Sequence, residues 1–309
     1  MQNVLFIAQK LLSLYVFVSL DFIAAKVLNV RKEMLAPLVI YLLTPILFFQ
    51  GVMDTPLSGG RIFLPLVIFV LASSFAVATY VFGRVIFKKP ALNILAFSAG
   101  NANSGYFGFP LAYLLYGEDG LGLAVLVALG FVIYENSVGF YLVARGRHSA
   151  REALRRLFRL PALYAFALAL LLKGVQVVPP VWMHDMAGIV RGAYTVLGMM
   201  IVGMGMADIR RSHFDFRFVS FSIGMKYLVW PLAMIAFLTL EESVWGGFDM
   251  ASRRALFLVS IVPLAANTVA FATLLKAEPE KSALAVLLST LLALLAIPLW
   301  LTFKAGLAL

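Results

Sequence analysis

The sequence contains no cysteine, few charged residues and only three histidines. The absence of cysteine excludes disulfides, thiolate metal sites and cysteine nucleophiles from this chain. The histidines, His148, His184 and His213, lie far apart in polar connections, so we expect no metal cluster and no cofactor. Acidic and basic residues make up 13% of the chain, whereas soluble domains carry roughly 25%.

Hydrophobic sequence, in contrast, is abundant. Hydrophobic residues account for 62% of the chain, and the mean hydropathy is +0.97. Apolar runs of membrane-spanning length recur along the whole sequence, which predicts an integral membrane protein. The alternating ten-residue segments of a membrane β-barrel are absent from the sequence, so we expect helices. We assign the net charge of +10 to basic cytoplasmic loops and not to nucleic-acid binding.

We place ten helical spans, each long enough to cross an apolar membrane core of about 30 Å. They cover residues 4–25, 34–53, 61–84, 91–116, 119–142, 161–178, 186–207, 217–240, 253–275 and 281–304. The basic residues concentrate in the connections that face the cytoplasm if both termini lie outside. We therefore predict extracytoplasmic termini in a bacterial inner membrane.

The longest basic connection, ARGRHSAREALRRLFRL over 144–160, divides the chain into segments 1–142 and 161–309, with 143–160 as a cytoplasmic linker. Helical apolar spacing in 149–160 favours a short helix on anionic lipid headgroups, although a plain basic loop explains these residues equally well. Five spans on each side of the linker require the second half to insert upside down relative to the first. This pattern is typical of a transporter built from two inverted five-helix repeats.

Two of the spans contain residues that interrupt helices. Span four contains GNANSGYFGFP, residues 100–110, and span nine contains SIVPLAANTVAFA, residues 260–272. Glycine and proline disfavour a helix interior, and each segment also carries an asparagine followed by a small hydroxyl residue. Interruptions at equivalent positions of two inverted halves are the best sequence indication of a transporter's binding site.

An interrupted helix offers free N–H groups, which suit a carboxylate, and neighbouring asparagine amides can donate to the same group. The predicted substrate-binding residues are Asn101, Asn103, Ser104, Gly105, Asn267 and Thr268. The predicted helix-breaking residues are Gly108, Pro110 and Pro263. The alternative is that these small and polar residues only allow close helix packing, and that Asn101 only bonds freed backbone groups.

Two ionisable residues lie deep in predicted spans, and such residues are functional candidates by default. Glu135 occurs in FVIYENSVGF and Lys226 in SIGMKYLVWP. They either form an ion pair, which would be structural, or act separately in coupling. In the second case, Glu135 would carry a proton, and Lys226 would neutralise an anionic substrate.

Several of these segments resemble a known family. NSGYFGFP (103–110) followed by LLYGEDGLGLAVL is similar to the fourth-helix signature of the auxin efflux carrier family, which includes the plant PIN-formed proteins. VPLAANTVAFA (262–272) and LLSTLLALLAIPLW (287–300) resemble its ninth- and tenth-helix signature, and YLLTPILFF (41–49) resembles the second-helix pattern. The resemblance covers essentially the whole chain, without the long hydrophilic loop of the long plant members.

The resemblance implies a fold like that of bile acid sodium symporters, in which helices four and nine are unwound near proline and cross in the membrane. Helices 1, 2, 6 and 7 would form a scaffold, and the others would carry an organic anion by an elevator motion. The family's substrates are auxins in plants and dicarboxylates in bacteria. By analogy with the plant members, we expect a homodimer.

Coupling remains open between three alternatives. Protons require only Glu135, sodium would use Ser289, Thr290 and Glu135, and an uncoupled uniporter needs no ion. We find no deep His, Asp or Ser constellation for a membrane enzyme, so we expect a transporter.

Overall fold

The computed structural model describes residues 2–28, 35, 37–57, 60–144, 151, 155, 158–207 and 215–306. Within these ranges the chain is helical and contains no β-strand. The predicted interfacial helix at 149–160 lies mostly outside the described residues, as do Arg31, Lys32, Arg210 and Arg211 of the predicted cytoplasmic connections.

The first half of the chain contains the following elements. They are α1 (Gln2–Leu28), a π-helical turn (Val39–Leu43), α3 (Thr44–Asp54), a 3₁₀ turn (Arg61–Phe63), α4 (Leu64–Gly83), α5 (Ala91–Ala99), a π-helical turn (Ser104–Gly108), α6 (Phe109–Tyr134), a π-helical turn (Glu135–Gly139) and α7 (Phe140–Val143). Helix α6 is interrupted at Gly117, whose φ of 70° and ψ of −153° are not helical. This interruption falls between predicted spans four and five.

The second half of the chain, from Pro161 onward, is also helical where the structure describes it. Its elements are α9 (Pro161–Gly174), α10 (Val181–Ala207), α11 (Phe216–Gly224), a π-helical turn (Met225–Val229), α12 (Trp230–Val244), α13 (Met250–Ile261), α14 (Asn267–Leu274) and α15 (Pro279–Gly306). Proline stands in the first turn of α3, α4, α6, α9 and α12. At α9, which follows the extended residue Leu160, its missing N–H costs no helical hydrogen bond.

Many of these helices are suited to a membrane. Within the described residues, five helical segments are long and apolar enough to cross one: Arg61–Gly83, Ala91–Val143, Val181–Gly203, Phe216–Val244 and Pro279–Phe303. Shorter apolar helices cover Leu11–Leu20, Val39–Asp54 and Pro161–Gly174. The described residues are therefore all helical, as predicted, and consistent with an integral membrane protein.

The surface of α1 illustrates how these helices face lipid. Leu12, Leu20 and Val27 lie on its exposed side, with exposed fractions of 55%, 55% and 69%. Leu11 and Leu14 face inward and are almost completely buried. A long apolar stripe of this kind would be unfavourable in water but is compatible with lipid chains.

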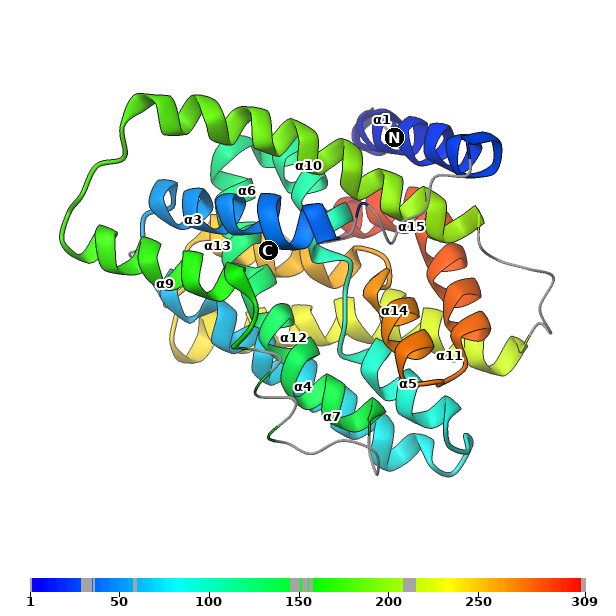
Figure 1. Ribbon diagram of the computed structural model, residues 1–309. Helices are drawn as coiled ribbons and strands as arrows, with labels where there is room; N and C mark the ends of the chain where they lie inside the picture. The colour runs from blue at the N-terminus through cyan, green and yellow to red at the C-terminus, as the bar shows by residue number, and fades with distance from the viewer. Residues whose placement is uncertain are drawn as a thin grey trace.

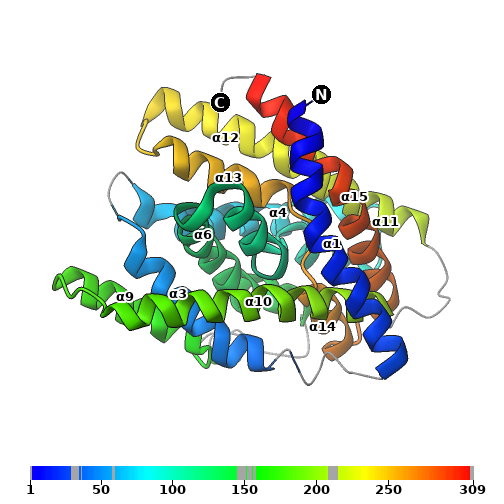
Figure 2. The same cartoon turned by 90° about the horizontal axis from the view of Figure 1, so that it is seen from above.

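The helices pack into two groups. Helix α1 packs against α10, and α3 packs against both α9 and α10. We call these four helices, α1, α3, α9 and α10, the α10 group. Helix α6 packs against α4 and α13, and α15 packs against α11 and α14. We call the helices α4–α7 and α11–α15 the α6 group. In Figure 1 α10 runs beside α1, and Figure 2 shows α3, α9 and α10 along one edge of the molecule, with α12 and α13 along the opposite edge. The two groups meet where α3 contacts α6 and α1 contacts α15.

Gly130 brings α6 unusually close to α4. A Cβ atom at Gly130 would lie 2.8 Å from the Cβ of Ile68 and would overlap the carbonyl oxygen of Pro65. We expect Gly130→Ala to lower the free energy of unfolding by about 1–3 kcal/mol, because α4 and α6 must move apart. Gly192→Ala is the matched control, since a Cβ there meets nothing within 4 Å. Thermal unfolding in detergent measures both, and equal melting temperatures for the two variants would contradict this description of the contact.

Candidate functional site

The first interrupted segment lies between α5 and the π-helical turn that precedes α6. Helix α5 ends at Ala99, residues 101–103 are not helical, and Asn103 has φ of −75° and ψ of 59°. Gly108 lies in the π-helical turn after this interruption, and Pro110 lies in the first turn of α6. The interruption therefore comes earlier in the sequence than these two predicted helix-breaking residues, because proline is readily accommodated in a first helical turn.

The second interrupted segment separates α13 from α14. Helix α13 ends at Ile261, Val262 is extended with φ of −70° and ψ of 157°, and α14 begins at Asn267. Pro263 lies inside this interruption. A proline at this point prevents the chain from continuing as one helix.

The two interruptions contact each other directly through the backbone. The N–H of Asn103 donates to the carbonyl oxygen of Pro263 at 2.9 Å. The N–H of Leu264 donates to Oγ of Ser289 on α15 at 3.1 Å. Freed backbone groups inside a membrane protein need such partners, and here each interruption supplies part of what the other requires.

The carboxylate of Glu135 joins the two interruptions a second time. Its Oε1 accepts a hydrogen bond from Nδ2 of Asn101 at 2.7 Å, and its Oε2 accepts one from Nδ2 of Asn267 at 3.1 Å. Glu135 opens the π-helical turn after α6, a local distortion that often occurs at functional sites. A single buried carboxylate therefore holds an amide from each interrupted segment.

A cavity of about 340 Å³ lies beside this carboxylate. Its polar lining includes Asn103, Ser104, Glu135 and Asn267, and the rest of its wall is mostly apolar, with both aliphatic and aromatic residues. The aromatic lining residues are Tyr41, Phe48, Tyr106, Phe109, Phe131, Tyr194 and Phe271. None of the described lining residues is a lysine or an arginine.

One donor at this cavity lacks a protein partner. Asn103 is 4% exposed, and its Nδ2 has no hydrogen-bond partner among the described residues. Leaving a buried amide unbonded costs roughly 1–3 kcal/mol, so a ligand that accepts this hydrogen bond would recover that cost.

The predicted substrate-binding residues are thus distributed between two positions. Asn103, Ser104, Gly105 and Asn267 line the cavity. Asn101 is completely buried and does not line it; its Oδ1 accepts from the N–H of Ala102 at 2.8 Å while its amide donates to Glu135. This partly matches the alternative in which Asn101 bonds freed backbone. Thr268 is also buried outside the lining, and its Oγ1 has no partner among the described residues.

Lys226 lies away from Glu135's hydrogen bonds. It is fully buried, its Nζ donates to the carbonyl oxygen of Val259 at 3.1 Å, and it lies 5.3 Å from the ring centroid of Trp230. No ion pair between Lys226 and Glu135 occurs in the described structure. A cation near the C-terminal turn of α13 is favourable because the helix dipole is negative there.

Trp230, which was not predicted from the sequence, donates a hydrogen bond to the end of α5 in the same way that Lys226 does to α13. Its Nε1–H donates to the carbonyl oxygen of Ala99, the last residue of α5, at 2.6 Å. The span formed by α11 and α12 therefore supplies a donor to the last turn of each helix that precedes an interruption. The available sequence signal was a tryptophan in an apolar span, since a buried indole N–H requires a partner.

A helical membrane protein with a polar cavity at the meeting point of two interrupted segments has the architecture of a transporter. The chain matches the membrane transport protein family over residues 6–301. It is 26% identical to an uncharacterized transporter of Methanocaldococcus jannaschii, over 89% of this chain and 92% of that protein. It is 24% identical to an uncharacterized transporter of Methanothermobacter thermautotrophicus, over 94% of this chain and 96% of that protein.

The chain therefore belongs to the membrane transport protein family, which is the auxin efflux carrier family that its motifs resemble. It is a transport protein and not an enzyme.

The cap that Trp230 places on α5 can be tested by removing its donor. Trp230→Phe should lower the free energy of unfolding by about 1–3 kcal/mol, because the carbonyl of Ala99 is left buried without this donor. Trp182→Phe is the control, since Trp182 is 62% exposed. Thermal unfolding of both variants in detergent checks the prediction, which fails if Trp230→Phe is as stable as the control.

Proposed function

We propose that this protein is a secondary transporter that moves a small organic anion across the membrane by an elevator motion, coupled to protons. The proposal includes ten spans in two inverted five-helix repeats, residues 1–142 and 161–309, joined by the cytoplasmic linker 143–160. Both termini would lie outside a bacterial inner membrane. The observation that carries it is the unbonded amide of Asn103, which lies in a cavity lined by both interrupted segments.

The lining of the cavity favours one carboxylate attached to an apolar body. The free amide of Asn103 and the neighbouring hydroxyl of Ser104 can bind one carboxylate without a buried cation. The aromatic residues offer contact to an apolar or aromatic body. A dicarboxylate would place its second charge against this apolar wall, where the loss of hydration is costly. We therefore infer a monocarboxylate substrate.

Glu135 provides the argument for a proton. An ionised Glu135 about 5 Å from a bound carboxylate would repel it by about 3 kcal/mol at an effective dielectric constant of 20. Protonation removes this repulsion, so substrate and proton would bind together. Ser289 and Thr290, the candidate sodium ligands, both donate their hydroxyl hydrogens to the carbonyl oxygen of Val286, at 2.8 Å each. Oγ of Ser289 also accepts the N–H of Leu264 at 3.1 Å, so this hydroxyl is both donor and acceptor within the fold. The argument for protons rests on Glu135.

The packing of the helices supports an elevator motion. The cavity is lined from both sides: Thr44, Phe48 and Tyr194 belong to the α10 group, and Asn103 and Asn267 belong to the α6 group. Movement of the α6 group along the α10 group would carry the polar half of the cavity across the membrane. The α10 group corresponds to the scaffold that the family resemblance implies.

Asn103 can be tested by ligand binding to purified protein. We expect benzoate and indole-3-acetate, but not malonate, to raise the melting temperature of the wild-type protein. Asn103→Ala should weaken binding about 10-fold or more, because a charge-assisted hydrogen bond is lost. Asn136→Ala is the control, because Asn136 also lines the cavity but its amide already donates to the carbonyl of Val132 at 2.9 Å. Unchanged binding by Asn103→Ala would remove this residue from the site.

Glu135 can be tested through the pH dependence of transport. Uptake by the wild-type protein should rise as pH falls on the side that substrate enters, because a proton is taken up with the anion. Glu135→Gln has no titratable group at this position, so its uptake should be independent of pH in the same range. The other titratable residues that line the described cavity are Tyr41, Tyr106 and Tyr194, which remain in the variant.

The control for this experiment is Glu280→Gln, a change at an exposed carboxylate near the start of α15. Uptake in proteoliposomes at a series of pH values measures all three proteins. A Glu135→Gln variant with the pH profile of the wild-type protein would exclude Glu135 as the proton carrier.

A further inference from the structure

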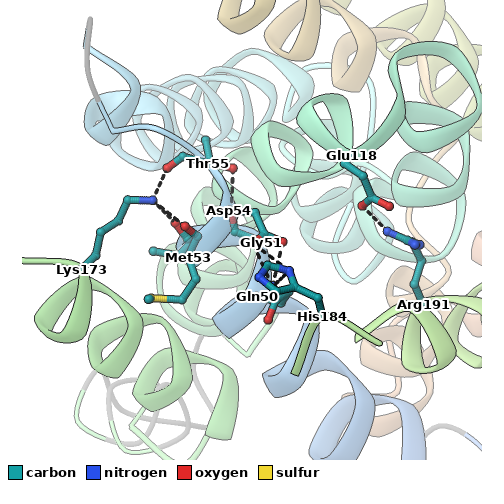
Figure 3. Close-up of polar contacts among 10 residues, drawn as sticks. Gln50, Gly51, Met53, Asp54, Thr55, Glu118, Lys173, His184 and Arg191 are labelled. Carbon is teal, nitrogen blue, oxygen red and sulfur yellow. Dashed lines mark hydrogen bonds and ion pairs between the residues drawn. The ribbon is translucent and has the colours of Figure 1, made fainter. Parts of the chain in front are cut away.

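Polar contacts made by Lys173, His184 and Arg191 lie toward one end of the molecule, opposite the end where α9 begins. Helix α9 begins at Pro161, beside the linker and the cavity, and Lys173 lies at its other end. There Lys173 donates to the carbonyl oxygens of Val52 and Met53 at 2.8 Å each and of Thr55 at 2.5 Å, at the end of α3. Figure 3 shows this contact and, on α10, the side chains of His184 and Arg191.

His184 and Arg191 differ in the group of helices that they contact. Nδ1 of His184 lies 2.9 Å from Nε2 of Gln50 and 3.5 Å from a carboxylate oxygen of Asp54, both on α3 of the same α10 group. Arg191 instead forms an ion pair with Glu118 of α6, across the boundary between the two groups (Figure 3). An ion pair in this position must break if the two groups slide past each other.

The backbone next to Glu118 has room for the change in position that breaking this ion pair requires. Gly117, directly before it, has a positive φ of 70°, and a Cβ there would meet nothing within 4 Å. The guanidinium carbon of Arg191 also lies 4.4 Å from the ring centroid of Tyr113, which holds the cation by a cation–π contact. Arg191 is 23% exposed and Glu118 is 56% exposed at their side chains, so both groups reach solvent.

Arg191 is close to the cavity along α10. Tyr194 follows it by three residues, a rise of about 4.5 Å, and lines the cavity. The ring of Tyr194 lies 6.1 Å from that of Tyr106 and 5.6 Å from that of Phe109, centroid to centroid. These three rings belong to both groups of helices, and all three line the cavity.

We propose that Arg191 and Glu118 form a gate at this end, and that Arg191 exchanges Glu118 for the carboxylate of the substrate when the gate opens. The second part rests on the proposed transport of an organic anion. The exchange replaces one charge-assisted hydrogen bond by another, so the guanidinium is never left without an anionic partner. The carboxylate would then pass Tyr194 and reach the amide of Asn103.

A second ion pair supplies a matched control. Arg61 pairs with Asp249, also outside the interrupted segments, but both residues adjoin helices of the α6 group: Arg61 lies in the 3₁₀ turn before α4, and Asp249 directly precedes α13. The side chain of Arg61 is 16% exposed and that of Asp249 is 41% exposed, close to the values for the gate. Sliding of one group along the other would leave this pair intact.

The gate itself is tested without any substrate. The chain lacks cysteine, so Ala128→Cys, a single cysteine in the cavity lining, reports access to the cavity. We expect Glu118→Gln and Arg191→Gln each to accelerate its reaction with a membrane-impermeant maleimide added from the gate side. The acceleration should be about 1.5- to 5-fold, the range for partly exposed ion pairs. The reversed pair, E118R with R191E, should return the rate toward that of the parent, and Arg61→Gln should leave it unchanged.

The exchange is tested by uptake of indole-3-acetate from the gate side. Glu118→Gln should leave the KM equal to or below that of the parent, because the competing carboxylate is gone. Arg191→Gln should raise the KM about 10-fold, because the receiving cation is lost. A purely structural pair would instead give the same change in KM for both variants.

The results separate the two proposals. Labelling rates that are the same in Glu118→Gln, Arg191→Gln and Arg61→Gln overturn the gate. Equal KM values for Glu118→Gln and Arg191→Gln overturn the exchange. If the parent protein transports no monocarboxylate, the proposed substrate and the exchange are both wrong, while the labelling rates still decide whether the gate exists.

Discussion

A helix interrupted inside a membrane protein frees backbone groups that cannot bond to water, and this requirement organises the centre of the molecule. The N–H of Asn103 finds the carbonyl of Pro263, and the N–H of Leu264 finds the hydroxyl of Ser289. The two interruptions are stable because they face each other and the neighbouring helices. The same arrangement leaves the amide nitrogen of Asn103, a residue that lines the cavity, without an acceptor among the residues that the structure describes.

The buried charges follow the same logic. Glu135 is held by amides from both interrupted segments, and Lys226 is held against the C-terminal turn of α13. Because the two are apart, Glu135 is the acidic group among the described residues that line the cavity, whereas a buried ion pair would have neutralised it. Under our proposal this separation matters, because an acid that loses and gains a proton can regulate the binding of an anion.

The boundary between the two groups of helices is where our proposed motion would occur. Its contacts include aromatic pairs, as between Tyr106 and Tyr194, and ion pairing at the surface, as between Arg191 and Glu118. Partly exposed ion pairs contribute little stability and can exchange partners readily. Glycine brings helices close inside a group, as Gly130 does between α4 and α6, and also across the boundary, where a Cβ at Gly122 of α6 would overlap Oγ1 of Thr55 at the end of α3.

The sequence by itself determined the class of the protein, because its hydrophobicity and low charge fit only a helical membrane protein. Local chemistry also located the interrupted segments near residues 100 and 263, since glycine, asparagine and proline act on the backbone of their own neighbourhood. Only the tertiary structure decided that Asn101 and Asn267 bind Glu135, that Lys226 binds Val259, and that Trp230 caps α5. These contacts join residues that are 33 to 132 positions apart in the sequence, and the direction of a side chain across such distances depends on how whole helices pack.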